Sequence, residues 1–423
     1  MSERVTDEGA RERPGATERQ GASEQTGLSS LAGLRVIEMG VWVAGPAATA
    51  LLADWGADVI KVEPPHGDPM RGVFNSIGIE RVQNAAFELD NRGKRSVVLN
   101  VRSSEDRSRL EELLSGADVF VSNLRPDTLD GFGLEAYETV ERHPHLVYCS
   151  VSGYGLRGMD RNRPSYDIGA FWARSGLSMQ MADSEGSPLI PRGGVGDHIT
   201  ALAVLSGLLA AVLEQRLTGR GRVVEVSLLR TGTYVLGWDL GIQLALGKVA
   251  GPERRQTNQS PLMNPYRTAD GKWFFFTGLE TARHLPSVCR ALGRADLLDD
   301  ERFADARSVR KHRAEVIAIL DEVISERTFA EWAEAFDREG VFWAPAQTPA
   351  EVVEDPQLLA TDGFVEINAD ESGAPWRSVN GPVAFSGVEN VPIARAPALG
   401  EHTEEVLKEL SLGNRRAREA RGR

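Results

Sequence analysis

The 423-residue sequence has only two cysteines, Cys149 and Cys289, and neither stands in a CxxC pair. So few cysteines argue against a disulfide framework or a cysteine zinc site, and they fit a reducing cytoplasm as the location. Cys149 falls in the run Leu146–Val151, which is typical of a buried strand. We therefore expect this thiol to pack in a core rather than to react.

An excess of positive charge is also lacking, since 61 Asp and Glu outnumber 48 Lys and Arg and the formal net charge is −13. This balance argues against a nucleic acid or an anionic membrane as the main partner. Hydrophobic residues at 41% and charged residues at 26% are the proportions of a soluble globular protein. We expect no apolar run long enough to span a membrane. Local clusters of Arg and Lys can still hold a small anionic ligand, so a small molecule is the predicted partner.

Residues 1–30 have almost no large apolar side chains and no apolar segment of the kind that a secretory signal needs. We expect them to form a disordered tail, because they cannot bury enough surface to offset the entropy of ordering. The remaining chain is too long for one ordinary core. We predict a large domain over residues 31–229, a small domain over 230–340, and a return to the large domain over 341–423.

Short β-branched runs alternate with helical patterns in the first half of the chain. Leu34–Met39 and Asp58–Glu63 read as buried strands on either side of a helix that follows Pro46. The alternation continues along the chain, with strands at Ser96–Val101, Asp118–Ser122, Leu146–Ser152 and Arg222–Ser227, and helices at Ser104–Ser115 and Leu134–His143. Repeated strand–helix–strand units predict an α/β fold with a doubly wound parallel sheet.

Three common motifs are missing. The first strand-to-helix turn, Val41–Pro46, lacks GxGxxG, which disfavours a nicotinamide oxidoreductase. No GxxxxGK[ST] segment is present, which disfavours the common ATPases and kinases. The seven histidines form no HExxH or similar cluster, so we expect no metal.

A glycine-rich segment, Arg192–His198, precedes an apolar helical stretch from His198 to Leu217 that we expect to be buried on all sides. Asp197 is predicted to lie at or next to the helix N-cap. One interpretation is a capping residue with no further function. The other is a carboxylate nucleophile, kept ionised by the helix N-terminus, with free amides nearby to stabilise an oxyanion. His198 is predicted to be structural, because adjacent helical residues do not face each other.

Several basic residues lie near the ends of predicted strands and could hold phosphates. Each one alone is more often a solvated surface charge. The segment Asn91–Arg95 is denser, since one turn there carries three cations. The candidates are Lys61, Arg71, Arg92, Lys94, Arg95 and Arg125.

Taken in order, blocks along the chain make it resemble the class III CoA-transferases, the family of formyl-CoA transferase, carnitine CoA-transferase and alpha-methylacyl-CoA racemase. The resemblance extends from about Leu31 to Leu412. It rests on Leu31–Glu38, Gly45-Pro46, Gly56–Glu63, Asn91–Ser96, Asn123–Pro126, Ser152–Gly155, Tyr166-Asp167, Gly196-Asp197, Thr218–Gly221 and Leu399–Thr403.

The resemblance implies that Asp197 is the nucleophile of a covalent mechanism. An acyl-CoA thioester would acylate this carboxylate to a mixed anhydride, and the released CoA would then form an aspartyl-CoA thioester. An acceptor carboxylic acid would finally receive the CoA. The resemblance also implies a Rossmann-like large domain, coenzyme A carried as substrate, and a homodimer whose two chains are interlocked.

Residues near the CoA follow from the same resemblance. Val43, Ala44, Leu99, Asn123 and Leu124 match positions that line the nucleotide groove. Basic residues of the formyl-CoA transferases are replaced in this chain by Pro64, Gly131 and Pro164. We therefore expect the phosphate contacts to come from Arg71, Lys94 and Arg125.

The block Tyr166-Asp167 separates the two activities of the family. Racemases have a histidine before this acid, whereas Tyr166, with an ordinary pKa near 10, is a poor base at neutral pH. This favours a transferase, with Tyr166 and Asp167 in the site and Asp167 as the second candidate nucleophile. Glu280 matches a racemase-site glutamate and points the other way. A racemase-type isomerase and an acyl-CoA-binding protein without turnover therefore remain as alternatives, and the two acids exchanged stay unnamed.

Overall fold

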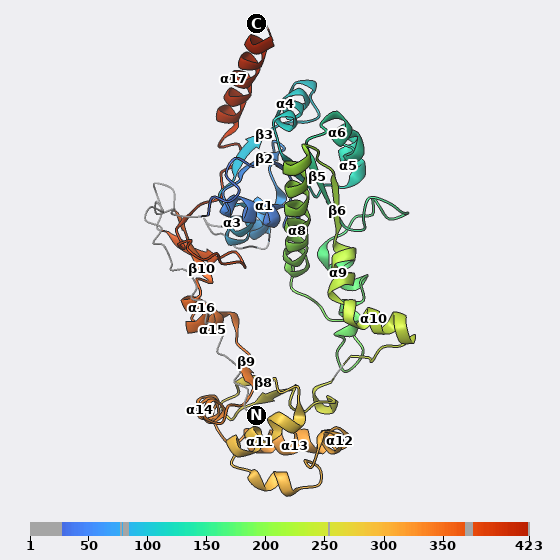
Figure 1. The fold of residues 1–423 in the computed structure, drawn as a ribbon, viewed down its shortest axis with the longest axis vertical. Helices are drawn as coiled ribbons and strands as arrows, with labels where there is room; N and C mark the ends of the chain where they lie inside the picture. The colour runs from blue at the N-terminus through green and yellow to red at the C-terminus, as the bar shows by residue number, and fades with distance from the viewer. Residues whose placement is uncertain (1–27, 77, 79–83, 253, 369–374, 422–423) are drawn as a thin grey trace, which may run out of the picture.

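The computed structural model describes residues 28–76, 78, 84–252, 254–368 and 375–421. Most of the predicted tail, residues 1–27, lies outside this part of the chain. The described chain forms a large α/β body and a smaller body at the opposite end of the long axis (Figure 1). Two stretches of chain join them, one carrying α9 (Leu228–Val235) and α10 (Gly237–Leu246), the other α15 (Pro349–Val352) and α16 (Pro356–Ala360).

The large body is built on six parallel strands in the order β3-β2-β1-β4-β5-β6. These are β1 (Arg35–Met39), β2 (Asp58–Glu63), β3 (Arg95–Val98), β4 (Val119–Ser122), β5 (Val147–Ser152) and β6 (Val223–Ser227). Ile37 of β1 pairs in register with Ile60 of β2 and Phe120 of β4. Alternate residues belong to separate cores on the two faces, so Val36 and Ile37 point to opposite sides. The predicted parallel α/β fold is confirmed.

Helices cover both faces of the sheet. One face carries α1 (Ala44–Asp54), α3 (Ala85–Asn91) and α8 (Val195–Thr218). The other carries α4 (Ser104–Ser115), α5 (Pro126–Gly131), α6 (Ala136–Arg142) and the C-terminal α17 (Thr403–Arg421). Shorter helical turns of the large body are η1 (Pro69–Gly72), α2 (Val73–Ser76), η2 (Ile168–Ala173) and α7 (Leu177–Gln180), whereas η3 (Arg255–Thr257) and η4 (Ala295–Asp299) pack in the smaller body.

Helix α8 corrects two expectations. It is long and apolar enough, by length and composition alone, to cross a membrane, a test that the core helix of a soluble protein also passes. It is also not buried all round, because Leu213 is 63% and Leu217 79% exposed. Its inner face packs on α1 and on β5 and β6, with Val204 and Leu208 in the core. The pattern of leucines marks an apolar helix but does not tell which faces the chain itself covers.

The smaller body has its own apolar core of residues between Leu262 and Val341. An antiparallel sheet in the order β7-β8-β9 packs on helices there. Its elements are β7 (Pro265–Arg267), β8 (Trp273–Phe276), α11 (Thr281–Ala291), α12 (Ala306–Lys311), α13 (Arg313–Ile324), α14 (Phe329–Glu339) and β9 (Trp343–Pro345). Helix α9, placed in the small domain by the sequence, packs instead against η2 and α8 of the large body.

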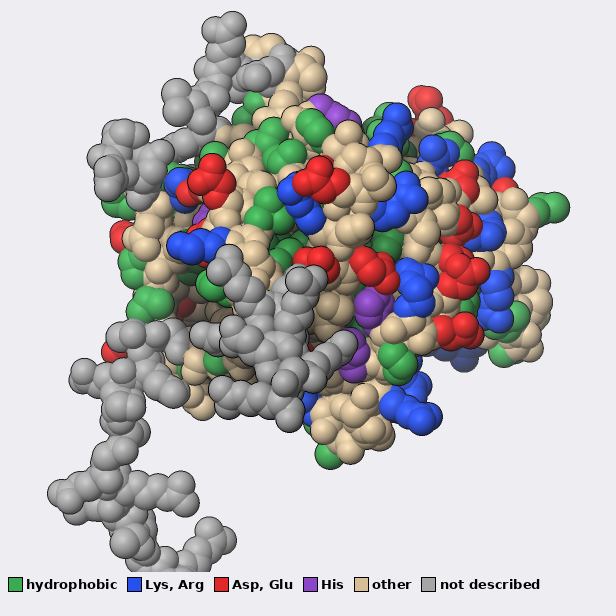
Figure 2. All heavy atoms as spheres, turned by 90° about the horizontal axis from the view of Figure 1, so that it is seen from above, with side chains coloured by type: hydrophobic (Ala, Val, Ile, Leu, Met, Phe, Trp, Pro, Cys, Tyr) green, Lys and Arg blue, Asp and Glu red, His purple; other side chains and the backbone are tan. Residues whose placement is uncertain are grey.

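The C-terminal stretch packs against the large body. A third sheet, β11-β10-β12, consists of β10 (Phe364–Asn368), β11 (Trp376–Val379) and β12 (Ile393–Ala394). The amide of Gly93 donates to the Ala394 carbonyl at 2.9 Å. Helix α17 is tied to the sheet by ion pairs of Arg35 and Arg95 with Glu409. Seen from the α17 end, basic and acidic side chains are interspersed over the surface (Figure 2).

Candidate functional site

A pocket of about 400 Å³ opens at the carboxyl ends of β1, β4 and β5. Its walls are the turn 41–44 after β1, residues 123–126 and 128 around the start of α5, the end of β5, the loop 161–166, and Asp197 on α8. Neighbouring strands β1 and β4 start crossovers that run in opposite directions along the sheet. Such a switch point leaves a crevice outside the strand ends, where doubly wound proteins bind ligands.

The turn after β1 is held in a strained shape. Trp42 has φ = +63°, a left-handed conformation that is rare for a bulky residue. Its amide donates to Asp68 Oδ1 at 3.0 Å. The Asn123 side chain makes two hydrogen bonds to the backbone of Val41, the residue before Trp42. Its Oδ1 accepts from the Val41 amide at 2.8 Å, and its Nδ2 donates to the Val41 carbonyl at 2.6 Å. Strain of this kind is found mostly at functional sites, where the surroundings enforce it.

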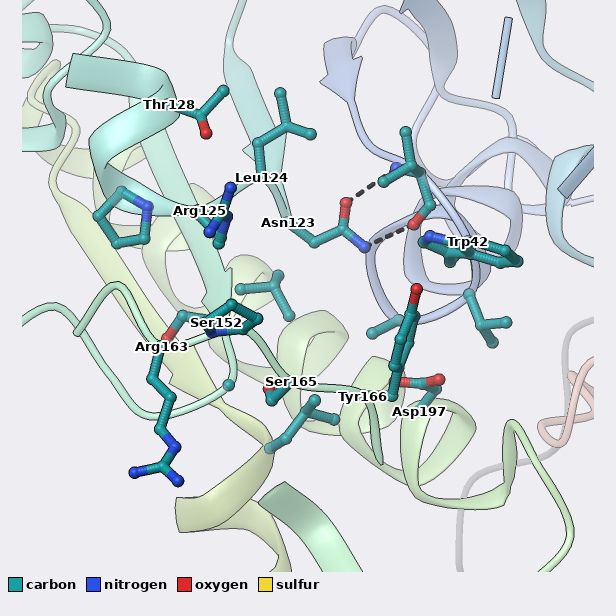
Figure 3. Close-up of a pocket in the computed structure, with 18 of the residues that line it drawn as sticks. Trp42, Asn123, Leu124, Arg125, Thr128, Ser152, Arg163, Ser165, Tyr166 and Asp197 are labelled. Atoms are coloured by element: carbon teal, nitrogen blue, oxygen red, sulfur yellow. Dashed lines mark hydrogen bonds between the residues drawn. The ribbon is translucent and has the colours of Figure 1, made fainter. Parts of the chain in front are cut away.

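Trp42 and Tyr166 form an aromatic wall beside Asp197. Their ring centroids lie 5.8 Å apart in an edge-to-face arrangement, and the Tyr166 side chain stands next to the carboxylate of Asp197 (Figure 3). Arg125 and Arg163 are found at the other side of the pocket, away from this carboxylate (Figure 3). The pocket therefore has an aromatic, acidic end and a basic end.

Asp197 is the third residue of α8, whose N-cap is Gly194, so it is not the capping residue. Its pKa is raised to about 7, chiefly by burial and then by the charge of Asp167, with a smaller contribution from Asp90, while His198 opposes the rise. The sequence predicts that the helix N-terminus favours the ionised form of Asp197, but this terminus does not keep the pKa of the carboxyl in its ordinary range. The half-charge of a helix terminus is outweighed by desolvation and two neighbouring carboxylates.

The cap of α8 comes from Asp167, far away in sequence. Asp167 is only 4% exposed, and its Oδ2 accepts hydrogen bonds from the amides of Gly194 and Gly196 at 3.1 and 3.2 Å. It stands immediately before η2, a π-helical turn in which the Arg174 amide donates to the Gly169 carbonyl. Asp167 therefore orients the N-terminus of α8, and its buried position leaves it poorly placed to attack a substrate.

The basic candidates separate into buried and accessible residues. Lys94 is fully buried, and its ammonium contacts Glu38 Oε2 at 2.6 Å, while burial lowers its pKa to about 8. Lys61 is equally buried beside Glu38 and Asp68. Glu38 in turn has its pKa lowered to about 2, since the two ammonium groups outweigh the effect of burial. Lys94 is therefore corrected from a phosphate ligand to part of a buried ionic cluster beneath the pocket.

Two further expected contacts do not reach the pocket. Arg71 makes a bidentate ion pair with Glu63, at 2.6 and 2.8 Å, and also donates to the Pro397 carbonyl. Leu99 is 2% exposed and packs in the core under α4. Arg92 and Arg95 are likewise paired, with Asp54 and with Asp58. The sequence showed cations near strand ends, but not which of them acids of the same chain already neutralise.

Of the expected residues, Val43, Ala44, Asn123, Leu124 and Arg125 line the pocket together with Tyr166 and Asp197. The Arg125 side chain is exposed and makes no hydrogen bond or ion pair to the part of the chain that the structure describes.

Two basic residues escaped the sequence analysis, Arg161 and Arg163, which line the pocket beside Arg125. Arg161 is held by Asp130 at 3.0 Å and Arg163 is 62% exposed. The signal that could have found them is the loop 156–163, which carries three arginines directly after a buried strand.

Glu280, the residue that pointed to a racemase, does not line this pocket. It lies exposed at the N-terminus of α11 in the smaller body, where it pairs with Arg283 at 3.4 Å. Within the described residues, no group of three or more His, Cys, Asp and Glu could hold a metal ion. Cys149 is completely buried and burial raises its pKa to about 12, as expected for a thiol that only packs.

The architecture defines an α/β protein with an acid and a cluster of arginines at the switch point of a parallel sheet. Residues 31–403 match CoA-transferase family III, so the chain belongs to this family. It is 34% identical to the (R)-2-hydroxy-4-methylpentanoate CoA-transferase of Clostridioides difficile, covering 89% of this chain and 94% of the relative.

Two further comparisons agree. The cinnamoyl-CoA:phenyllactate CoA-transferase of Clostridium sporogenes is 33% identical, over 89% of this chain and 92% of that protein. The crystal structure of a CaiB/BaiF family protein from Brucella suis matches with a TM-score of 0.79 at 28% identity, covering 90% of this chain and all of that one. The protein is therefore an enzyme of the CoA-transferase type that uses CoA thioesters.

Proposed function

We propose that the enzyme transfers CoA between an acyl-CoA and a free carboxylic acid through covalent intermediates on Asp197. The observation that carries this proposal is the place of the Asp197 carboxylate, on the wall of the pocket and opposite its arginines. In the first step a carboxylate oxygen attacks the thioester carbonyl, the C–S bond breaks, and a mixed anhydride and CoA thiolate result. The thiolate then attacks the Asp197 carbonyl carbon and expels the donor acid, leaving an aspartyl-CoA thioester.

The acceptor reverses these steps. Its carboxylate attacks the aspartyl carbonyl carbon and releases the thiolate, which then attacks the acceptor's carbonyl carbon in the new anhydride. The Asp197 carboxylate leaves in its original form. Two amides are positioned to stabilise the tetrahedral oxyanions, because Asp167 accepts from Gly194 and Gly196 but leaves the N–H groups of Val195 and Asp197 without a partner in the described chain.

The basic end of the pocket suits the CoA phosphates. Arg125, Arg161 and Arg163 are the cations there, and guanidinium groups bind phosphate oxygens in bidentate fashion. The strand order supports a Rossmann-like, nucleotide-binding sheet. CoA would then extend from this end toward Asp197, so that the thioester reaches the aromatic wall.

The acyl group that fits this wall is branched or aromatic. Trp42 and Tyr166 offer apolar ring surface, and Val41, Val43 and Leu228 extend it along the pocket. Among the described residues that line the pocket, the cations are arginines at the other side, so none of them is placed to hold a second carboxylate beside Asp197. Two relatives are named for 2-hydroxy-4-methylpentanoate and for cinnamoyl-CoA and phenyllactate, which have such side chains. We propose monocarboxylic acids with a branched or aromatic side chain as donor and acceptor.

The proposed assembly is a homodimer with interlocked chains, in the cytoplasm. Helix α10 buries no residue within the described chain, and Trp238 and Leu244 on it are 84% and 88% exposed. Helix α8 separately exposes Leu213 and Leu217, and exposed apolar surface of this extent is typical of a protein–protein interface. The two free cysteines are buried, which suits a reducing compartment.

The covalent route is tested by trapping. Wild-type protein is incubated with an aromatic acyl-CoA and then with hydroxylamine, and the peptide that contains residue 197 is examined by mass spectrometry. We expect conversion of Asp197 to a hydroxamate, and none in Asp197→Asn, although that variant still binds acyl-CoA. Efficient transfer of labelled CoA by Asp197→Asn would refute this nucleophile. Deuterium entering the α-carbon at the rate of transfer would instead indicate a racemase.

A further inference from the structure

His198 directly follows the proposed nucleophile and is held at both ring nitrogens. Its Nδ1 lies 2.8 Å from the carbonyl oxygen of Gly194, one turn back in α8. Its Nε2 lies 3.0 Å from Oδ1 of Asp90, the penultimate residue of α3. The ring therefore links the first turn of α8 to α3, on the same face of the sheet.

Both partners of the ring are hydrogen-bond acceptors. A carbonyl oxygen has no proton to give, and a neutral imidazole has one donor and one acceptor nitrogen. Only the imidazolium form, with two N–H donors, satisfies both contacts. A proton shared between an imidazole and a carboxylate resides on the imidazole, because its ordinary affinity for protons exceeds that of a carboxylate by about two pH units.

Asp90 has the position of a counterion. It is 2% exposed, and among the described residues its carboxylate accepts a hydrogen bond from no side chain other than His198. The nearby ammonium of Lys94 donates to the backbone carbonyl of Asp90, not to its carboxylate, and is engaged by Glu38. A buried carboxylate requires a cationic partner. His198 supplies that charge.

We propose that His198 is a positioning residue, held as an imidazolium by Asp90 and the Gly194 carbonyl, whose fixed positive charge keeps Asp197 ionised for attack. This inference rests on the proposed function, since it acts through the Asp197 carboxylate. Burial, Asp167 and Asp90 all favour the protonated, unreactive form of Asp197, and His198 is the cation that opposes them. The pKa of His198 is itself raised, chiefly by its hydrogen bond to Asp90.

Other ionisable side chains on the elements around α8 are engaged elsewhere or distant from this pair. Asp54 of α1 binds Arg92, and Glu225 of β6 accepts from the Leu156 amide. On β5, burial raises the pKa of both Tyr148 and Cys149, so both stay neutral. On α9, Arg230 and Tyr234 are not among the main causes of the raised pKa of Asp197 or of His198. The relevant groups are therefore Asp90, Asp167, Asp197 and His198.

The charge state of His198 can be measured without turnover. Wild-type protein labelled with ¹⁵N-histidine is titrated by NMR, and the His198 signals are identified by their loss in His198→Gln. We expect both ring nitrogens to remain protonated above pH 7, where an ordinary imidazole is mostly neutral. In Asp90→Asn the same signals should titrate at lower pH. A neutral His198 ring at pH 7 in the wild type would overturn the proposal.

The effect on Asp197 is read from kcat/KM for CoA transfer as a function of pH. A neighbouring opposite charge typically changes a carboxyl pKa by about one unit or more. The acid limb of this profile is the fall in kcat/KM at low pH, where Asp197 becomes protonated. In His198→Gln the acid limb should therefore lie about one pH unit higher. At a pH below the limb kcat/KM should be about tenfold lower than in the wild type, and at high pH the difference should disappear. His198→Lys, which retains a cation, should restore the limb. His312→Gln is the matched control, because His312 pairs with Glu315 in the smaller body.

The outcomes separate this inference from the proposed function. If Asp197→Asn is inactive but the limb of a folded His198→Gln stays in place, or its activity falls equally at all pH values, the inference alone is wrong. If Asp197→Asn keeps transfer activity, the proposed nucleophile is wrong, and with it the role given to His198. A limb that moves in His198→Gln and returns in His198→Lys supports both.

Discussion

We expect Asp197→Asn to stabilise the folded protein at alkaline pH while it abolishes CoA transfer. A carboxylate that must be ionised to react is here partly buried, next to the charges of Asp167 and Asp90. Its ionisation is therefore less favourable in the folded state than in the unfolded chain. The ionised Asp197 that the reaction requires thus lowers the free energy of unfolding. Asparagine has nearly the same shape and carries no charge, so it removes this penalty together with the nucleophile.

The size of the effect follows from the pKa of Asp197, which is raised from 3.8 to about 7. Between these two values the folded protein holds a proton that the unfolded chain has released, so stability falls as pH rises through this window. A tenfold difference in proton affinity between the folded and unfolded states corresponds to about 1.36 kcal/mol, so the destabilisation above pH 7 amounts to at most about 4 kcal/mol. Below about pH 4 the difference between wild type and Asp197→Asn should vanish, since both side chains are then uncharged.

The assay is urea-induced unfolding of wild type and Asp197→Asn at pH 5 and pH 8, at one protein concentration. The advantage of the variant should be about 1–2 kcal/mol at pH 5 and grow by about a further 2–3 kcal/mol at pH 8. Asp167→Asn is the matched control. Because Asp167 accepts two backbone amides of α8, its replacement should destabilise the protein by about 1 kcal/mol at pH 5, and by less at pH 8, where removal of its charge eases the ionisation of Asp197. Equal stability of wild type and Asp197→Asn at pH 8 would refute the argument.

Three further predictions concern turnover. Removing the charge in Asp167→Asn should lower the pKa of Asp197, so the acid limb of the pH–rate profile moves to lower pH, and an unmoved limb would contradict the coupling. Arg125→Gln should raise KM for acyl-CoA about tenfold with kcat nearly unchanged, while Arg338→Gln on remote α14 leaves both constant; a fall in kcat alone would argue against phosphate binding. Trp42→Ala should impair transfer from aromatic acyl-CoA thioesters far more than from acetyl-CoA, and an equal loss for both would remove Trp42 from substrate selection.

Much of the secondary structure could be predicted from local signals. Strand β2 and helix α4 have the predicted bounds, Asp58–Glu63 and Ser104–Ser115. A β-branched run set off by Gly56 marks the strand, and Ser103, whose side chain accepts from the Asp106 amide, caps the helix. β3 ends at Val98, not at the predicted Val101, because the chain turns into α4 there. These signals involve residues only a few positions apart, so they can be recognised in the sequence alone.

The fate of each charged side chain was less predictable, because it depends on partners remote in sequence. Lys94 and Arg125 look alike as cations at strand ends, yet Lys94 is buried against Glu38 and Arg125 is exposed to the pocket. Likewise, a glycine-rich segment before an apolar helix predicts a helix N-terminus near Asp197. It does not reveal that Asp167, which lies on another loop, accepts the hydrogen bonds of the first amides of this helix.

By itself, the sequence determined the alternation of strands and helices, and the position of one acid at the start of the apolar helix α8. Both depend on neighbours along the chain, through periodicity and glycine. The tertiary structure alone decided the strand order, which places the turn at Trp42, the loop with Arg163, and Asp197 around one pocket. It also decided the charge environment of Asp197, because desolvation and Coulomb energy depend on distances in space that no spacing along the chain expresses.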